Sequence, residues 1–369
     1  MSVHKRISAV RRILDSNAWN AIVITSPENR HYLSGYTAED HAADESAGVL
    51  VITSDAACLY VAPTNLPWAI SEVPPAIVDV VPWSASWTAS VAAQLERSDS
   101  RTVAVEDATT TAASWFALRD AVSPTVSILA SGDAIDSLRA VKSSQEIAIL
   151  AEAARCTDAA FLQAISRFES GMTERQAANL VHNALRHAGS DGEAFDTIVA
   201  SGPNAAKPHH RPGSRALAEG EPIIIDMGAR VDGYNGDLSR TVCLGKPDQR
   251  LVTIYEAVLA AQIAGLEAIR MGAHASAPDN ASRDVFTDHD LEEYVIHSVG
   301  HGLGLRVHEA PAVSRRSTRP LETGNVITIE PGLYVPDWGG VRIEDVAVVD
   351  SDGHRNLTTA PKGVATISL

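Results

Sequence analysis

The sequence has few of the features that mark several large classes of protein. Its three cysteines (Cys58, Cys156 and Cys243) are odd in number and far apart, so neither a disulfide framework nor a paired-cysteine zinc site is expected. No stretch reaches the about 18 apolar residues of a membrane-spanning helix. The N-terminus is basic but lacks the apolar core of a signal peptide. We therefore expect a cytoplasmic protein without a membrane partner.

Basic residues are also in the minority. The 369-residue chain has 46 Asp and Glu against 30 Lys and Arg, which gives a formal net charge of -16. Nucleic acids and anionic membranes bind basic surfaces, so this balance argues against both as main partners. With 45% hydrophobic and 21% charged residues, the composition is that of a globular protein, and the length favours two domains.

The first third of the chain alternates helix and strand patterns. Apolar residues at helical spacing predict a helix over residues 4–17. Short β-branched runs predict strands at 21–25, 47–53, 57–61, 102–106 and 125–130. Strands that alternate with helices indicate an α/β domain, which we expect to cover residues 1–135.

A second domain, of mixed α+β pattern, is predicted for residues 140–369. A long helical pattern begins after Ser143 or Ser144, either of which could cap it, and a second covers 173–188, with Gly189 as its end. Further segments are predicted as strands at 195–200, 222–228 and 238–244, and as a helix at 249–271. Short strands rich in histidine and glutamate follow from residue 295 onward.

Several acidic residues stand at the ends of apolar strand patterns. Asp226 ends one such run, and Asp237 follows a glycine-containing segment typical of a hairpin, which would bring the two carboxylates together. Glu330 and Glu344 end or interrupt two further apolar runs. A buried carboxylate is unfavourable unless a cation compensates it. Each residue alone has an ordinary explanation as a turn former or strand end, and only the combination suggests a metal site.

One histidine joins this acidic set. His301 lies between glycines that let the backbone approach a crowded site. His308, seven residues on, would face the opposite side of an extended strand unless the glycines break the alternation. Two aspartates, two glutamates and one neutral histidine carry about four negative charges, which two divalent ions would balance.

Four motifs resemble the pita-bread metallopeptidases, and within them the proline-specific branch of prolidases and aminopeptidases P. The motifs are DxGxxxxGYxxDxxRT (226–241), GHGxGxxVHE (300–309), TIEPGLY (328–334) and GGVRIED (339–345). The resemblance spans the whole chain and includes TSPENRHYLSGY (25–36). It implies an N-terminal creatinase-like α/β domain followed by a C-terminal pita-bread metallopeptidase domain, in a homodimer.

The resemblance also implies the site residues. The family's metal ligands correspond to Asp226, Asp237, His301, Glu330 and Glu344. His209 and His308 correspond to catalytic histidines, with His210 as the alternative to His209, and His297 and Arg342 correspond to substrate-binding residues. The implied cofactor is a pair of divalent metal ions, with Mn expected and Co, Zn or Fe as alternatives.

The implied activity is hydrolysis of the bond before proline in Xaa-Pro dipeptides. Glu330 would act both as ligand and as the catalytic proton carrier, while His209 and His308 would stabilise the oxyanion. Two departures from the family pattern, Lys207 and Arg306, are interpreted as solvated neighbours of the site.

Other activities remain open at this point. An aminopeptidase P would remove the first residue from longer Xaa-Pro peptides, and a related enzyme would act on a small non-peptide compound at the same metal site. A non-catalytic binding protein of this fold would lack the ligands, and all five are present.

Overall fold

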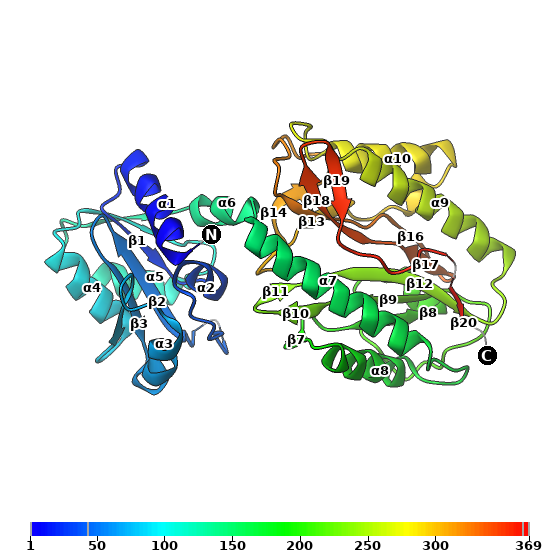
Figure 1. Cartoon of the computed structure of the whole chain (residues 1–369), viewed down its shortest axis with the longest axis horizontal. Coiled ribbons are helices and arrows are strands. Elements are labelled where there is room, and N and C mark those ends of the chain that lie inside the picture. Colours follow the sequence, from blue (N-terminus) through cyan, green and yellow to red (C-terminus); the bar gives the residue numbers. More distant parts are fainter. Residues whose placement is uncertain (1, 43, 364, 368–369) are drawn as a thin grey trace. The chain divides into compact units, whose positions relative to one another are not determined.

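The computed structural model in Figure 1 describes residues 2–42, 44–363 and 365–367. The chain divides into two compact units, residues 1–139 and 140–369, each of which mixes helices and strands. In the part of the chain that is described, no helix is both long and apolar enough to cross a membrane.

The N-terminal unit is built on a six-stranded sheet in the order β4-β3-β2-β1-β5-β6. Its strands are β1 (Ala21–Ile24), β2 (Gly48–Thr53), β3 (Ala57–Val61), β4 (Asp79–Pro82), β5 (Thr102–Val105) and β6 (Ser127–Ala130). Its helices are α1 (Val3–Ser16), α2 (Pro27–Ser34), α3 (Leu66–Glu72), α4 (Trp87–Arg97), α5 (Ala112–Ala121) and α6 (Ala134–Ala140), which begins in this unit. The central strand β1 is buried along its whole length between antiparallel β2 and parallel β5, which explains its unbroken apolar sequence.

The C-terminal unit contains two larger sheets. The first has the order β20-β12-β9-β8 and the second the order β14-β13-β15-β18-β19. The first sheet comprises β8 (Ile198–Ser201), β9 (Ile223–Met227), β12 (Leu238–Leu244) and β20 (Ala365–Ile367). The second comprises β13 (Gly300–Gly302), β14 (Glu309–Val313), β15 (Val326–Ile329), β18 (Asp345–Asp350) and β19 (Gly353–Asn356). The strands β7 (Gly192–Glu193), β10 (Ala229–Val231), β11 (Tyr234–Asn235), β16 (Gly332–Val335) and β17 (Gly339–Arg342) form two smaller sheets.

Each of the larger sheets has its own pair of helices, as Figure 1 shows. The helices α7 (Ser144–Ile165) and α8 (Glu174–His187) share an apolar core with the first sheet. The helices α9 (Gln249–Glu267) and α10 (Ala277–Asp288) lie on the side of the second sheet and of β16 and β17. The unit therefore has two layers, each made of a sheet and a pair of helices. Side chains from both sheets come together where the two sheets meet.

Helices α7 and α8 begin where the sequence predicts, but helix α9 ends earlier than predicted. Both α7 and α8 begin with a capping box, in which Ser143 and Thr173 are the N-caps. Helix α9 ends at Glu267 rather than at residue 271, because the chain leaves the helix to pair with a distant segment. Gly272 N donates to Leu321 O, and Leu321 N donates to Ala273 O, both at 2.8 Å.

The predicted hairpin between the two aspartates is confirmed. Strand β9 pairs with β12 in a register that sets Asp226 opposite Ser239, and the short strands β10 and β11 form the tip. The two residues of the turn, Asp232 and Gly233, both have positive φ (47° and 78°), as two-residue hairpin turns require. Asp237 directly precedes β12 and therefore returns to the level of β9.

Strand β12 is tied to the end of β17 and to the residues that follow it. Glu344 N donates to Ser239 O at 3.1 Å, and Arg342 N donates to Thr241 Oγ1 at 3.0 Å. Beside these bonds, Arg240 pairs with Asp345 at 2.9 Å, and both side chains are almost fully buried. Arg240 also donates to main-chain carbonyls on both sides of this junction, so the pair holds β12 and β18 in one fixed relation.

This pair gives a testable consequence for stability. Arg240→Met is expected to lower the free energy of unfolding by about 3–5 kcal/mol, because Asp345 loses its arginine and keeps only Lys362 as a cation, and because four main-chain carbonyls lose their donor. Denaturant titration followed by circular dichroism measures the change. Arg155→Met is the control, because Arg155 pairs with Glu152 on an exposed face of α7 and its loss should be hardly measurable. Equal small losses for both variants would contradict this account.

Candidate active site

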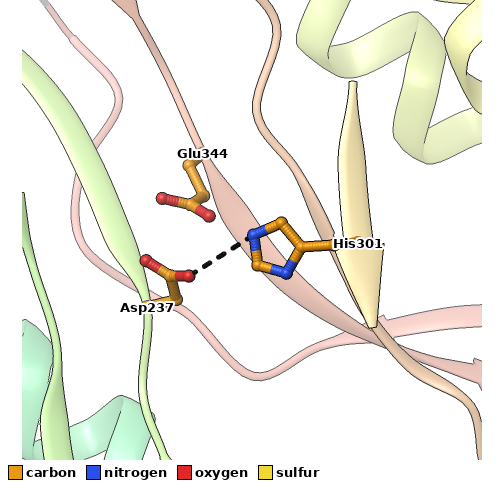
Figure 2. A group of neighbouring side chains, drawn as sticks. All are labelled: Asp237, His301 and Glu344. Carbon is orange, nitrogen blue, oxygen red and sulfur yellow. Dashed lines mark ion pairs between the residues drawn. The ribbon is translucent and has the colours of Figure 1, made fainter. Parts of the chain in front are cut away.

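Three side chains from different strands meet where the two sheets join. Figure 2 shows Asp237, His301 and Glu344 pointing toward one another, and one ligand atom from each lies within 4.8 Å of the others. They come from the residue before β12, from β13 and from the two-residue link between β17 and β18. Asp237 is only 5% exposed and Glu344 only 1%, so two acidic groups are held almost without water.

The remaining two predicted ligands flank this group. Glu330 Oε1 lies 3.2 Å from His301 Nε2, and the same nitrogen lies 3.7 Å from Asp237 Oδ2. Asp226 stands on β9, and its charge reaches the other carboxylates of the cluster. The structure therefore gathers all five residues, with Asp237, His301 and Glu344 as the tightest part. Their role as ligands stays a prediction.

The neighbouring charges strongly shift the pKa values of the carboxylates. Burial, and then the charges of the neighbouring carboxylates, hold the pKa values of Asp237 and Glu344 well above their ordinary range. Burial also raises the pKa of Asp226. Glu330 differs, because the hydrogen bond and charge of His301 outweigh burial and lower its pKa to about 2. The cluster is thus an excess of negative charge that a cation would stabilise.

The donor atoms of the cluster fit divalent metal ions. Asp226 Oδ1 and Glu344 Oε1 are buried and, among the described residues, have no hydrogen-bond donor. Such oxygens are costly unless a cation or a donor satisfies them. His301 Nδ1 donates to Gly302 O at 3.1 Å, and the hydrogen bond and charge of Glu330 outweigh burial and raise the pKa of His301. The protonated ring therefore donates from Nε2 to Glu330, and once that proton leaves, the Nε2 lone pair faces Asp237 and Glu330. Carboxylate oxygens with one imidazole nitrogen suit Mn, Fe, Co or Zn.

The backbone beside His301 is crowded, as the sequence predicts. A side chain at Gly300 would collide with the carbonyl oxygen of Thr328 on the neighbouring strand, so only glycine fits there. The pairing of β13 with β14 is irregular. This irregularity brings His308 back to His301, and their rings lie edge to face with centroids 4.3 Å apart.

Arg342 connects the acidic cluster to the polar residues beside it. Its buried guanidinium donates to Asp226 Oδ2 at 2.6 Å, to Ser239 Oγ at 2.6 Å and to Tyr334 Oη at 2.8 Å. Three of its nitrogens therefore bond protein groups, and it fixes the orientation of Asp226. A contact between Arg342 and substrate stays a prediction.

His297 is also bonded at both ring nitrogens. Its Nδ1 donates to Ser298 O at 2.7 Å, so in the neutral ring Nε2 accepts from Tyr334 Oη at 2.8 Å. Burial lowers the pKa of His297, which favours this neutral form. Arg342 thus donates both to Asp226 and to Tyr334, and Tyr334 in turn donates to His297, so hydrogen bonds link Asp226 to His297. The predicted contact of His297 with substrate stays a prediction.

The two remaining catalytic candidates are more open to solvent. His308 is exposed, and desolvation followed by the charge of His301 lowers its pKa, which favours a neutral ring. His209 is exposed and its charge acts on both His297 and His308. Its neighbour Pro208 accepts a 3.4 Å hydrogen bond from Arg342, which places this segment at the wall of the site.

The residue next to His209 faces elsewhere. His210 bonds Glu174 at 2.8 Å, outside the acidic cluster.

The two departures from the family pattern both make contacts within the protein. Lys207 is exposed and donates to Asn204 at 3.0 Å, while Arg306 is half-buried and its main-chain N–H donates to Glu309 at 3.2 Å.

Two polar residues of the site were not singled out from the sequence. Tyr334 bridges Arg342 and His297, and burial raises its pKa to about 12. Ser239 accepts from Arg342 and stands opposite Asp226. Both lie inside the quoted motifs, so the signal was present, but nothing in the spacing showed which side chains they would bond.

The fold and this acidic cluster are those of a metal-dependent hydrolase. The model of metallopeptidase family M24 matches residues 148–351, and that of the creatinase/prolidase N-terminal domain matches residues 6–141. The chain belongs to metallopeptidase family M24. The predicted fold class, a creatinase-like domain followed by a pita-bread domain, is confirmed by these matches and by the solved structures described next.

Similarity to known proteins extends over the full chain. It is 32% identical over 354 residues to an Xaa-Pro dipeptidase of Pyrococcus furiosus, covering 96% of this chain and 97% of the relative. The solved structure of an Xaa-Pro dipeptidase from Bacillus anthracis matches with a TM-score of 0.93, at 32% identity and over 100% of both chains. An X-Pro aminopeptidase from Thermotoga maritima matches with a TM-score of 0.85 and 28% identity, over 95% of this chain and 98% of its own.

The charge of the cluster predicts how metal affects stability. Metal at about 100 times its dissociation constant should stabilise the unaltered protein by about 2.7 kcal/mol, which corresponds to about 5–10 °C in the unfolding temperature. Asp237→Asn should lose most of this gain because it removes one carboxylate. In chelator the same variant should unfold at a higher temperature than the unaltered protein, because it relieves repulsion.

Scanning calorimetry with Mn and with chelator measures both effects. The matched control is Asp232→Asn, which changes an exposed aspartate in the same hairpin and keeps a residue type that tolerates positive φ. If Asp237→Asn and Asp232→Asn respond alike to Mn, Asp237 is not a ligand.

Proposed function

We propose that this chain hydrolyses the peptide bond before proline, with Xaa-Pro dipeptides as its main substrates. The observation that carries the proposal is the full-length similarity to Xaa-Pro dipeptidases in a chain that keeps all five acidic and histidine residues of the cluster. A relative that had lost its chemistry would not need to keep four mutually repelling carboxylates in one buried place.

In this proposal, a pair of divalent metal ions, with Mn expected before Co, Zn or Fe, is bound by the cluster. The ligands are Asp226, Asp237, His301, Glu330 and Glu344. The two buried oxygens without donors and the lone pair of His301 Nε2 support this assignment. When bound, such a centre supplies Lewis-acid activation of water and of the scissile carbonyl near neutral pH.

The chain's own residues then handle protons and charge. Beside bound cations Glu330 would stay ionised, which leaves it able to accept a proton from the attacking water. The ring N–H groups of His308 and His209 donate hydrogen bonds to the carbonyl oxygen as negative charge develops on it. Arg342 and Tyr334 keep Asp226 and His297 oriented while this happens.

Proline makes a particular demand on the last step. Its amide nitrogen has no N–H, so the site cannot recognise the bond through that donor, and ring shape and flanking charges must serve instead. The nitrogen leaves as an amine and needs a proton, which Glu330 delivers after it has taken one from water. Arg342 is the predicted partner of a free substrate carboxylate, through whichever N–H groups its protein bonds leave available.

An aminopeptidase P activity is the second candidate, and the similarity to the Thermotoga X-Pro aminopeptidase favours it. The two activities differ in whether the site accommodates residues beyond proline. A homodimer whose partner completes the wall of the site, and a cytoplasmic location, belong to the proposal as implied by the resemblance and by the sequence.

A matched set of peptides tests the proposal. Chelator-treated enzyme should not cleave Ala-Pro, and added Mn should restore cleavage, while Ala-Ala should stay at least about tenfold slower because its ring-free residue fits a proline site poorly. Amino-acid analysis of the products measures the rates.

The tripeptide Ala-Pro-Ala separates the two candidates. No cleavage of it supports a dipeptidase, and release of its first alanine supports an aminopeptidase P. If Mn-loaded enzyme cleaves none of these peptides, the substrate is not an Xaa-Pro compound, and the metal site stands as a separate question.

A further inference from the structure

The segment that carries His209 is fastened at both ends by one carboxylate. This segment, residues 202–213, is called here the His209 loop; it follows β8 and starts with a short helical turn (Gly202–Ala206). The carboxylate is that of Glu174, the first residue of α8. Glu174 lies outside the acidic cluster, and its side chain is completely buried.

Five donors converge on the two oxygens of Glu174. Its Oε1 accepts from the main-chain N–H of Ser201 at 2.9 Å, from Ser201 Oγ at 2.8 Å and from Asn204 Nδ2 at 3.0 Å. Its Oε2 accepts from His210 Nε2 at 2.8 Å and from the main-chain N–H of Gly213 at 3.0 Å. One oxygen thus binds the beginning of the loop and the other binds its end.

The hydrogen bonds that Glu174 accepts keep its carboxylate ionised. Burial acts to raise its pKa, but hydrogen bonds from Asn204, His210 and the main chain outweigh burial and lower it. The N-terminal end of α8 also favours a negative charge. An ionised carboxylate only accepts, so each of the five donors is held in a fixed direction.

Further bonds extend the network on both sides. Arg215 donates to Ser201 Oγ at 2.8 Å and forms a two-pronged pair with Glu221. Glu174 N donates to Arg215 O at 2.9 Å, so the chain after the loop also runs along the start of α8. On the other side, Pro208 meets Arg342 of the acidic cluster.

The two adjacent histidines divide their tasks. The two histidines share one turn, in which His210 N donates to Lys207 O at 3.1 Å, so a short fixed stretch of backbone joins their side chains. His210 bonds Glu174, and His209 interacts electrostatically with His297 and His308. Fixing the ring of His210 therefore fixes the direction of its neighbour.

We propose that Glu174 is a positioning residue that holds His209 toward the reacting carbonyl, through both ends of the His209 loop and through His210. The inference rests on the proposed function, since it assumes that His209 stabilises the oxyanion. A hydrogen-bond donor in that role must be aligned before the reaction, and a shift of about 1 Å can lower the rate by about a hundredfold.

The test compares variants of the metal-loaded enzyme with Ala-Pro as substrate. His209→Ala should lower kcat by about 100- to 1000-fold, as loss of an oxyanion donor does. Glu174→Gln keeps the shape but leaves some of the five donors unpaired, and should lower kcat by about 10- to 100-fold with a smaller change in KM. Combined with His209→Ala, it should add less than about threefold, because both variants remove the same contribution.

A control and a milder variant accompany these. Glu193→Gln alters a carboxylate that also bonds a histidine of α8, His182, at 3.1 Å, and it should leave kcat unchanged. His210→Gln removes only the ring that Glu174 holds, and should lower kcat by about tenfold where Glu174→Gln does not fold.

A second readout needs no substrate. Amide hydrogen exchange followed by mass spectrometry should become faster across residues 202–213 in Glu174→Gln, and should stay unchanged there in Glu193→Gln. This separates the inference from the proposed function, because the loop contact is tested even where no Xaa-Pro peptide is cleaved.

The outcomes distinguish a wrong role for His209 from a wrong role for Glu174. If His209→Ala is as fast as the unaltered enzyme, the role of His209 is wrong and the inference falls with it. If His209→Ala is slow but Glu174→Gln is not, or if the two losses multiply in full, only the inference is overturned. Unchanged exchange in the His209 loop would also overturn it.

Discussion

Repulsion among four clustered carboxylates, two of them buried and two partly buried, is the constraint that the rest of the C-terminal unit must satisfy. Asp237 and Glu344 are nearly inaccessible, and their pKa values lie well above the ordinary range because burial and neighbouring charges oppose ionisation. Folding brings them together only because other interactions hold the strands in place. The acidic cluster itself therefore destabilises the fold, and the interactions around it offset this cost. Such a cost is expected where charged residues serve a reaction rather than stability.

The compensating interactions lie immediately behind the cluster. The Arg240–Asp345 pair fixes β12 against β18, and main-chain bonds join β12 to the segment that carries Arg342 and Glu344. Arg342 then orients Asp226, Tyr334 and, through Tyr334, His297. On the opposite side, Glu174 fastens the His209 loop. These buried polar groups have fixed donors and acceptors, which is how a protein aligns a site before the substrate arrives.

Much of the local structure could be predicted from the sequence, because its signals are local. The caps of α7 and α8, the buried strand β1 and the hairpin between Asp226 and Asp237 all follow from neighbouring residues. The end of α9 could not be predicted, because a bond to Leu321 decides it. Likewise the contact of His301 with His308 depends on irregular strand pairing, and the bonds of Tyr334 and Glu174 join residues far apart in the chain. The gathering of the five candidate ligands was implied by a family resemblance, whereas spacing alone suggested only the two aspartates.

The central claim is that this cluster binds a pair of divalent metal ions. Diffraction from crystals grown with Mn, with an anomalous difference map calculated near the Mn absorption edge, tests it most directly. The account predicts two peaks, both bounded by oxygens of Asp226, Asp237, Glu330 and Glu344 and by Nε2 of His301. A map with no peak among these side chains, or with peaks only elsewhere on the chain, would contradict it.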